Sequence, residues 1–286
     1  MAELLTRQPW ILGVLLALAI AEWFWRTRIA HKSYDLQASF GSIGVAAIGA
    51  LLKPLNAAVI GFAFLGIAQI TPWQMPADDW RVWVVGFFGV EFAYYWFHRW
   101  SHTINWLWAS HAVHHSANEM TLPAAVRLGW TNALSGGWVV FVPLILIGFP
   151  PVVIVTLLAA NLLYQYSLHT EAIGKLGPLE YVFNTPSHHR AHHASDARWL
   201  DCNYGGVLIV FDRLFGTFVP EPDGGGLSYG LVKPLRSNNP VHIALRQWAI
   251  LFRAVRSAPG WRRRAELLIG RPSLLDRDAS MGKFEA

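Results

Sequence analysis

The chain has 286 residues, of which 53% are hydrophobic and 14% are charged, and its mean hydropathy is +0.31. This composition excludes an ordinary water-soluble domain and indicates a chain largely in contact with lipid. The formal charge of +5 is moderate, and the basic residues near the C-terminus favour a cytoplasmic membrane face over a nucleic-acid surface. The single cysteine, Cys202, excludes an internal disulfide and a cysteine-based zinc site, so a metal would need histidine and carboxylate ligands.

Apolar runs in the first hundred residues predict membrane-spanning helices. Residues 9–25 precede a basic loop, so a retained transmembrane anchor over residues 1–36 is favoured over a cleaved signal peptide. Residues 37–70 exceed the ~20 residues of one upright span and can form one long tilted helix or two spans. If both basic ends of the chain are cytoplasmic, charge parity favours a single crossing there and a second crossing over residues 80–97.

Histidines at ligand spacing recur in three parts of the chain. The stretch from Glu91 to Glu119 carries five of them, with the spacings HxxxH and HxxHH, and HxxHH returns further along the chain. Residues three, four or seven apart share one face of a helix, so each group can direct its imidazoles to one point. The candidate metal ligands are His98, His102, His111, His114, His115, His169, His189, His192 and His193.

Two further apolar runs, residues 130–149 and 151–168, are separated by a Gly-Phe-Pro-Pro turn and predict a transmembrane hairpin. This hairpin would return His169 to the membrane face on which the first five histidines lie. From Leu176 onward the mixed composition predicts a cytoplasmic cap of helices, and residues 242–256 suit a helix lying on lipid headgroups.

The expected fold class is therefore all-α: a polytopic membrane bundle of about four to five spans, with a cytoplasmic helical cap. We divide the chain into an N-terminal anchor (1–36), a membrane catalytic domain (37–234) and an interfacial helix with a flexible tail (235–286). The isolated histidines His31 and His242 are interpreted as polar anchors at the interface.

The histidine clusters predict a metal centre. Nine imidazoles brought together cannot all be protonated, because like charges at short distance repel. Neutral imidazole is the form that binds a metal, and three or four ligands complete one ion, so nine ligands fit two ions. Iron binds imidazole well and can change oxidation state with O₂, so redox chemistry is the economical interpretation.

The motifs also resemble a known family. They are YYWFHR at 94–99, WASHAVHHS at 108–116, NTPSHHRAHH at 184–193, and NYGGVLI with FDRLFGTF between 203 and 218. Over about residues 35 to 234 they resemble the fatty acid hydroxylase and sterol desaturase superfamily of membrane di-iron oxygenases, and within it the alkylglycerol monooxygenases. The resemblance implies O₂-dependent hydroxylation of a lipid carbon by two ferrous ions held by the nine histidines. It also implies tetrahydrobiopterin or an external electron donor as the source of electrons.

Four further residues are assigned to supporting roles in catalysis: Glu91, Gln165, His188 and Asp201. Glu91 precedes His98 by seven residues on one helix face. Carboxylates close to histidines are expected to fix the ligand tautomers, and those that follow histidines closely are Glu119, Glu171, Asp196 and Asp201. Gln165 stands where much of the superfamily has a histidine, so one ligand is missing or Gln165 supports another. His188 is surplus to HxxHH and would orient a ligand or bind in place of a neighbour.

Several alternatives stay open for these polar residues. Glu91 can instead pair with Arg99 or Arg127, and Asp212 with Arg213 can form a pair that only stabilises the fold. The acyl or alkyl chain of a lipid is expected to reach the metals through a slot between spans. Its proposed lining consists of Trp96, Trp100, Trp106 and Trp108.

Three classes of function remain. The favoured one is a lipid monooxygenase acting on an alkyl or acyl chain, an ether lipid or a sterol-like substrate. A desaturase on the same metal core is the first alternative, and a membrane metal transporter or storage protein is the second. The expected partners are the membrane, a lipid substrate and a separate electron donor, with no nucleic acid, and the oligomeric state is left open.

Overall fold

The computed structural model describes residues 9–275, and all regular secondary structure within that range is helical. The helices are α2 (Pro9–Phe24), the π-helix η1 (Trp25–Ile29), α3 (Leu36–Ile70), α4 (Trp80–Thr103), α5 (Asn105–His115), α6 (Leu122–Ala125), α7 (Asn132–Ser135), η2 (Gly137–Phe141), α8 (Val142–Leu146), α9 (Pro151–Tyr166), η3 (Gly177–Tyr181), α10 (Pro186–His192), α11 (Val210–Leu214), α12 (Pro240–Ser257) and α13 (Gly260–Ile269). Two isolated β-bridges join loops within the same range. The expectation of an all-α fold is confirmed.

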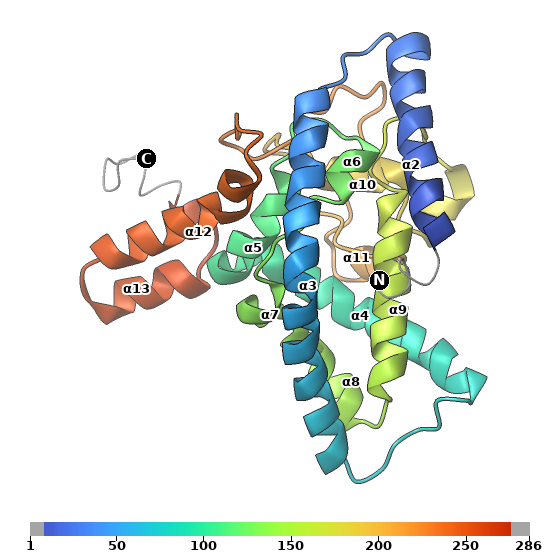
Figure 1. The fold of residues 1–286 in the computed structure, drawn as a ribbon, viewed down its shortest axis with the longest axis vertical. Coiled ribbons are helices and arrows are strands. Elements are labelled where there is room, and N and C mark those ends of the chain that lie inside the picture. Colours follow the sequence, from blue (N-terminus) through green and yellow to red (C-terminus); the bar gives the residue numbers. More distant parts are fainter. Residues whose placement is uncertain (1–8, 276–286) are drawn as a thin grey trace.

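Helix α3 runs along most of the height of the molecule (Figure 1). It has 35 residues and continues through Pro54, so residues 37–70 form one long helix and not two spans. The carboxylate of Asp35 caps its first turn by accepting a hydrogen bond from the Ala38 amide at 2.8 Å. At 1.5 Å per residue the helix is about 52 Å long, which exceeds the ~30 Å hydrocarbon core of a bilayer.

Among residues 9–275, two helical segments are long and apolar enough to cross a membrane, Trp10–Ile29 and Leu36–Ile70. The second leg of the expected hairpin is α9, but the first leg is not a single long helix. Residues 130–149 form three short helical pieces, because Gly136 adopts a left-handed conformation (φ 74°) between α7 and η2. The turn at 148–150 then leads into α9, as the sequence predicts.

The main apolar core lies where α4 crosses α9, and α3, η2 and α8 complete it. Phe64 from α3, Val90 from α4, Ile145 from α8 and Val153 from α9 are buried together in it. Because α4 ends directly at α5 and α9 ends close to His169, this core positions the elements that carry most of the histidines.

Helix α12 packs against the protein through its apolar face. Trp248, Leu251 and Ala254 are buried with Ala109 of α5, and the Trp248 ring meets Trp106 edge-on at 4.8 Å between centroids. The indole of Trp248 also donates a hydrogen bond to the Thr131 hydroxyl at 3.0 Å. The predicted amphipathic helix is therefore present, but protein and not lipid headgroups covers its buried face. The expected flexible tail beyond residue 275 lies outside the described residues.

Replacing Trp248 with Ala should lower the free energy of unfolding by about 3 kcal/mol or more, because a buried indole and its hydrogen bond are lost. The matched control is Trp261→Ala, whose side chain is 74% exposed on α13. Thermal unfolding of both variants in detergent micelles measures the difference. Equal melting temperatures for the two variants would contradict docking of α12 through Trp248.

Candidate metal centre

The histidines of the first cluster are placed by two consecutive helices. His98 and His102 share one face of α4 near its C-terminal end, and Ile104 alone separates α4 from α5. On α5, His111 and His115 stand four residues apart, and His114 directly precedes His115. The short helix α10 and its C-cap residue bring His189, His192 and His193 against them.

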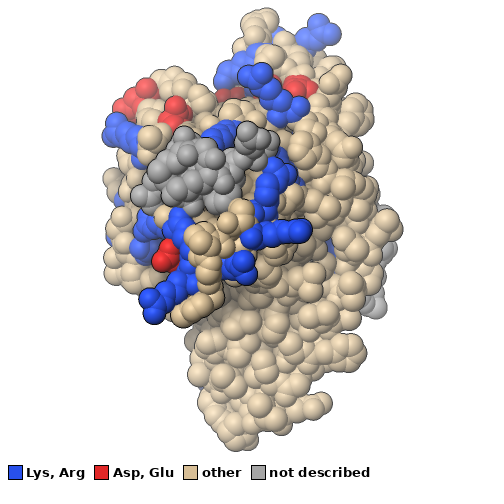
Figure 2. Space-filling model, turned by 90° about the vertical axis from the view of Figure 1, so that its left-hand side faces the viewer, with Lys and Arg blue, Asp and Glu red and all other residues tan. Residues whose placement is uncertain are grey.

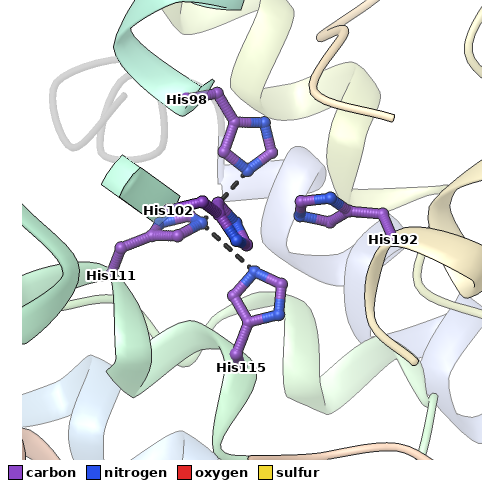
Figure 3. Close-up of side chains that lie close together, drawn as sticks. All are labelled: His98, His102, His111, His115 and His192. Carbon is purple, nitrogen blue, oxygen red and sulfur yellow. Dashed lines mark hydrogen bonds between the residues drawn. The ribbon is translucent and has the colours of Figure 1, made fainter. Parts of the chain in front are cut away.

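All nine predicted ligands come together, in two groups. The five-histidine group consists of His98, His102, His111, His115 and His192, and the four-histidine group of His114, His169, His189 and His193. Within each group the candidate ligand nitrogens lie within 4.8 Å of one another, and Figure 3 shows the five rings converging on one point. The two groups touch, since the rings of His115 and His193 stack with centroids 4.2 Å apart.

Backbone carbonyls fix the tautomer of four of these rings. The Nδ1 atom lies 2.8 Å from Tyr204 O in His98, 3.3 Å from Arg127 O in His114, 2.8 Å from Gln165 O in His169, and 2.7 Å from Cys202 O in His192. A carbonyl oxygen only accepts hydrogen bonds, so each Nδ1 must carry the proton. Each Nε2 of these neutral rings therefore presents a lone pair.

The resulting arrangement fits a bound cation. In the four-histidine group the Nε2 atoms of His114 and His169 face each other at 3.0 Å although neither carries a proton, a contact that is unfavourable unless a positive charge lies beside both lone pairs. In the five-histidine group the His192 Nε2 is buried without a hydrogen-bond partner among residues 9–275. His102 Nε2 of the same group and His193 Nε2 of the four-histidine group are also buried without a hydrogen-bond partner within that range.

Burial keeps these rings neutral. It lowers the pKa of His114 to about 4 and that of His192 to about 3, in both cases because a charged imidazolium would lose its hydration. The pKa of His169 is also well below its usual value, for the same reason and through repulsion from His114. At neutral pH the set is therefore available as uncharged nitrogen ligands.

The loop after α10 supplies two of the orienting carbonyls. Asp201 and Asn203 both adopt left-handed backbone conformations, with φ of 61° and 54°, and so turn the carbonyls of Cys202 and Tyr204 toward His192 and His98. The side chain of Asn203 holds this turn by donating to Val219 O at 2.7 Å and accepting from Val219 N at 2.9 Å.

Two buried carboxylates fasten the same loop. Asp212 accepts hydrogen bonds from the Tyr204 and Gly205 amides, both at 2.7 Å, and burial raises its pKa to about 6. Glu91 accepts from the Val207 and Leu208 amides at 2.8 and 3.0 Å. The alternative that Asp212 pairs with Arg213 is wrong, because Arg213 donates to Glu180 O instead. Asp212 holds the residue whose carbonyl orients His98.

Glu91 also belongs to a polar chain along α9, which explains the position of Gln165. Asn161 donates to Glu91, the Gln165 amide donates to Asn161 Oδ1, and Tyr94 donates to Gln165 Oε1 at 3.0 Å. The side chain of Gln165 is thus occupied by Tyr94 and Asn161, while its backbone carbonyl orients His169. The sequence-based alternative that Glu91 pairs with Arg99 or Arg127 is wrong.

The other assigned supporting residues lie at the edge of the groups. His188 is buried outside both groups, with its Nε2 3.9 Å from Glu180 Oε2 and its carbonyl accepting from Asn203. Asp201 Oδ1 lies 3.8 Å from His102 Nδ1, and its side chain is 44% exposed.

Three carboxylates that were expected to fix tautomers have other contacts. Glu119 and Glu171 pair with Arg26, and Asp196 accepts from the Ser228 amide at 3.1 Å.

Sequence reasoning considered Arg127 only as a partner for Glu91 and missed its role as a buried cation that joins the site to α3. Its guanidinium donates to Ser42 Oγ, Ser116 Oγ and Ala38 O, each at 3.1 Å, while its carbonyl accepts from His114. An arginine in an otherwise apolar segment is the signal that could have identified it.

A cavity of about 230 Å³ adjoins the five-histidine group, and His102, His115 and His192 form part of its wall. Of the four tryptophans expected to line a substrate slot, Trp108 lines this cavity. Trp96 and Trp100 instead pack on each other at 5.7 Å, and Trp106 packs on α12.

Comparison with known proteins supports the family assignment. Residues 83–217 match the family model for fatty acid hydroxylase. The chain is 38% identical to an alkylglycerol monooxygenase of Xenopus tropicalis over 201 residues, which cover 70% of this chain and 43% of the relative. It is 40% identical to an alkylglycerol monooxygenase of Homo sapiens (66% and 41% covered) and 31% identical to an ornithine lipid hydroxylase of Rhizobium tropici (52% and 45% covered).

The chain thus spans less than half the length of these relatives. No solved structure matches it. The resemblance to the fatty acid hydroxylase superfamily and to the alkylglycerol monooxygenases is confirmed, and the matched residues 83–217 contain all nine histidines of the two groups.

Acid should destabilise the metal-free protein. The folded-state pKa of His114 and His192 is depressed below 6.5, so between pH 6.5 and about 4 the unfolded chain binds protons that the folded chain excludes. Stability is full above pH 6.5 and falls as the pH decreases through this window, by about 3 kcal/mol for His114 alone. Melting temperatures of the chelator-treated protein from pH 7.5 to 4 check this, and a flat profile would contradict it.

Gln165→Ala should leave the metal content unchanged, because the amide side chain is bound to Tyr94 and Asn161 while the carbonyl that orients His169 remains. The variant should lose about 1–3 kcal/mol of stability, because Asn161 and Tyr94 lose buried partners. Metal analysis and thermal unfolding of the purified variant measure both effects. Loss of one ion per chain would instead identify Gln165 as a ligand.

Proposed function

We propose that this chain, whose residues 83–217 belong to the fatty acid hydroxylase family, is a membrane-bound oxygenase that hydroxylates a C–H bond of a lipid with O₂. The observation that carries the proposal is the convergence of nine neutral imidazoles into two touching groups, with lone pairs directed at common points. Two ions in nitrogen-rich surroundings suit iron. The alkylglycerol monooxygenases and the ornithine lipid hydroxylase are lipid-modifying enzymes by name, which supports a lipid substrate.

When bound, two ferrous ions would supply electrons to O₂ and so activate it for attack on an apolar C–H bond. The chain's own contribution is to hold the ligands and exclude water. Carbonyls of Tyr204, Cys202, Gln165 and Arg127 keep the Nε2 lone pairs directed inward, so the ligand shell is arranged before a metal enters. The cavity beside His102 and His115 offers a path for substrate to the five-histidine group.

The membrane topology of the proposal has four to five crossings, with the site at the cytoplasmic face. Charge distribution supports it: Figure 2 shows Lys and Arg gathered on the upper part of the molecule, while the lower part of that face is free of charged side chains. Electrons would come from a separate protein donor or from tetrahydrobiopterin.

His114→Ala should remove one of two bound irons per chain, because it deletes a ligand from the four-histidine group and leaves the five-histidine group complete. His242→Ala is the matched control, since His242 is exposed at the start of α12 and belongs to neither group. Iron analysis after anaerobic loading measures the stoichiometry. Two irons in His114→Ala would refute the ligand assignment.

The activity is tested by O₂ uptake and by mass spectrometry of lipids incubated with iron-loaded protein, a reductant and ¹⁸O₂. We expect one labelled oxygen in the lipid product and its loss in His114→Ala. A product two hydrogens lighter without label would identify a desaturase. Metal movement across vesicles without any O₂ uptake would identify a transporter.

A further inference from the structure

The cavity beside the five-histidine group has walls from distant parts of the chain. His102 and Trp108 come from α4 and α5, and α12 contributes residues from Arg246 to Ala254. Further lining residues come from the ranges 192–201, 230–233 and 271–275. Its volume of about 230 Å³ lies just below the range typical of small-molecule sites, so it can take a headgroup together with part of one chain.

The charged residues that line this cavity are predominantly basic. Four basic side chains line the cavity, namely Lys233, Arg246, Arg253 and Arg271. Asp201 is the one acidic residue among the described lining residues, and burial raises the pKa of its carboxyl although Arg271 lies close enough to oppose that shift. Figure 2 shows Lys and Arg side chains concentrated on the same side of the molecule, over α12 and α13. An anion entering the cavity would therefore meet a net positive surface.

The remaining wall is apolar. Leu200, Leu231, Ile250 and Leu275 line the cavity together with the indole of Trp108. Leu275 is buried, whereas Leu200 is 43% exposed, so the apolar wall extends from the protein interior to the surface. A ligand that matches this cavity has a charged end and a hydrocarbon end.

We propose that the cavity binds a phosphate-bearing amphiphile, whose phosphate meets the basic side chains and whose alkyl chain lies on the apolar wall beside His102 and His115. Guanidinium groups bind phosphate oxygens through paired hydrogen bonds, and a phosphate has enough oxygens to contact more than one of them at once. This inference rests on the proposed function, because it names the class of lipid presented to the five-histidine group. The basic wall thereby selects an anionic lipid over a neutral one.

The experiment compares the binding of three probes to the full chain in maltoside detergent by titration calorimetry. Dodecyl phosphate and dodecylglycerol ether share one alkyl chain and differ in charge, and inorganic phosphate lacks the chain. We expect dodecyl phosphate to bind at least roughly tenfold more tightly than either of the others. Arg246→Gln and Arg271→Gln should each weaken the binding of dodecyl phosphate by roughly tenfold. Neither substitution should change the affinity for dodecylglycerol ether.

The matched control is Arg256→Gln, which removes a charge from the same helix as Arg246 outside the cavity wall. It should leave the binding of all three probes unchanged. Equal affinity for the two amphiphiles, or equal weakening by Arg256→Gln and Arg246→Gln, overturns the proposal. Inorganic phosphate binding as tightly as dodecyl phosphate would make the cavity a free-anion site and overturns it as well.

Two measurements keep the result independent of folding and of the proposed activity. The melting temperature of each variant reports folding, and because Arg271 is exposed, Arg271→Gln decides the question if Arg246→Gln does not fold. Binding is measured without turnover. Selective binding of dodecyl phosphate without any lipid oxidation refutes the oxygenase alone, whereas oxidation without selectivity refutes only the phosphate site.

Discussion

The structure depends on keeping unprotonated imidazole nitrogens packed against one another in a buried space. His114 and His169 direct lone pairs at each other across 3.0 Å, which proteins avoid unless a cation is shared. That arrangement needs each ring to be held from behind, and the orienting groups are four main-chain carbonyls from three separate segments. Much of the remaining polar framework, including Asp212, Glu91 and Asn203, holds those segments in place.

The sequence predicted the members of the two groups because ligand spacing on a helix is a local property. It did not predict how the nine histidines divide between the two groups. His114 and His115 are neighbours in HxxHH, yet each belongs to a different group, and which ring joins which group follows from the approach of α10 and of the segment after α9. Orienting carbonyls carry no residue-type signature, so side-chain carboxylates were expected in their place. Residues 130–149 read as one apolar run although Gly136 interrupts the helix.

The N-terminal helix is more closely joined to the site than a simple anchor would be. Arg26 pairs with Glu119 and Glu171, which follow His115 and His169, and Lys32 reaches Glu171 at 3.1 Å. Glu22 accepts from the Leu122 amide at 2.6 Å. Charged residues at the end of an apolar run, which the sequence suggests only as topology signals, therefore also fasten the segments that carry ligands from both groups.

Two pairs of consecutive residues bridge the groups: His115 and His192 face one centre, while His114 and His193 face the other. The distance between the two histidine groups is consequently set by the covalent geometry of adjacent residues in α5 and at the end of α10. A long helix such as α3 can change its tilt when bilayer thickness changes. The spacing of the two histidine groups does not depend on that adjustment, so it stays the same when the tilt of α3 changes.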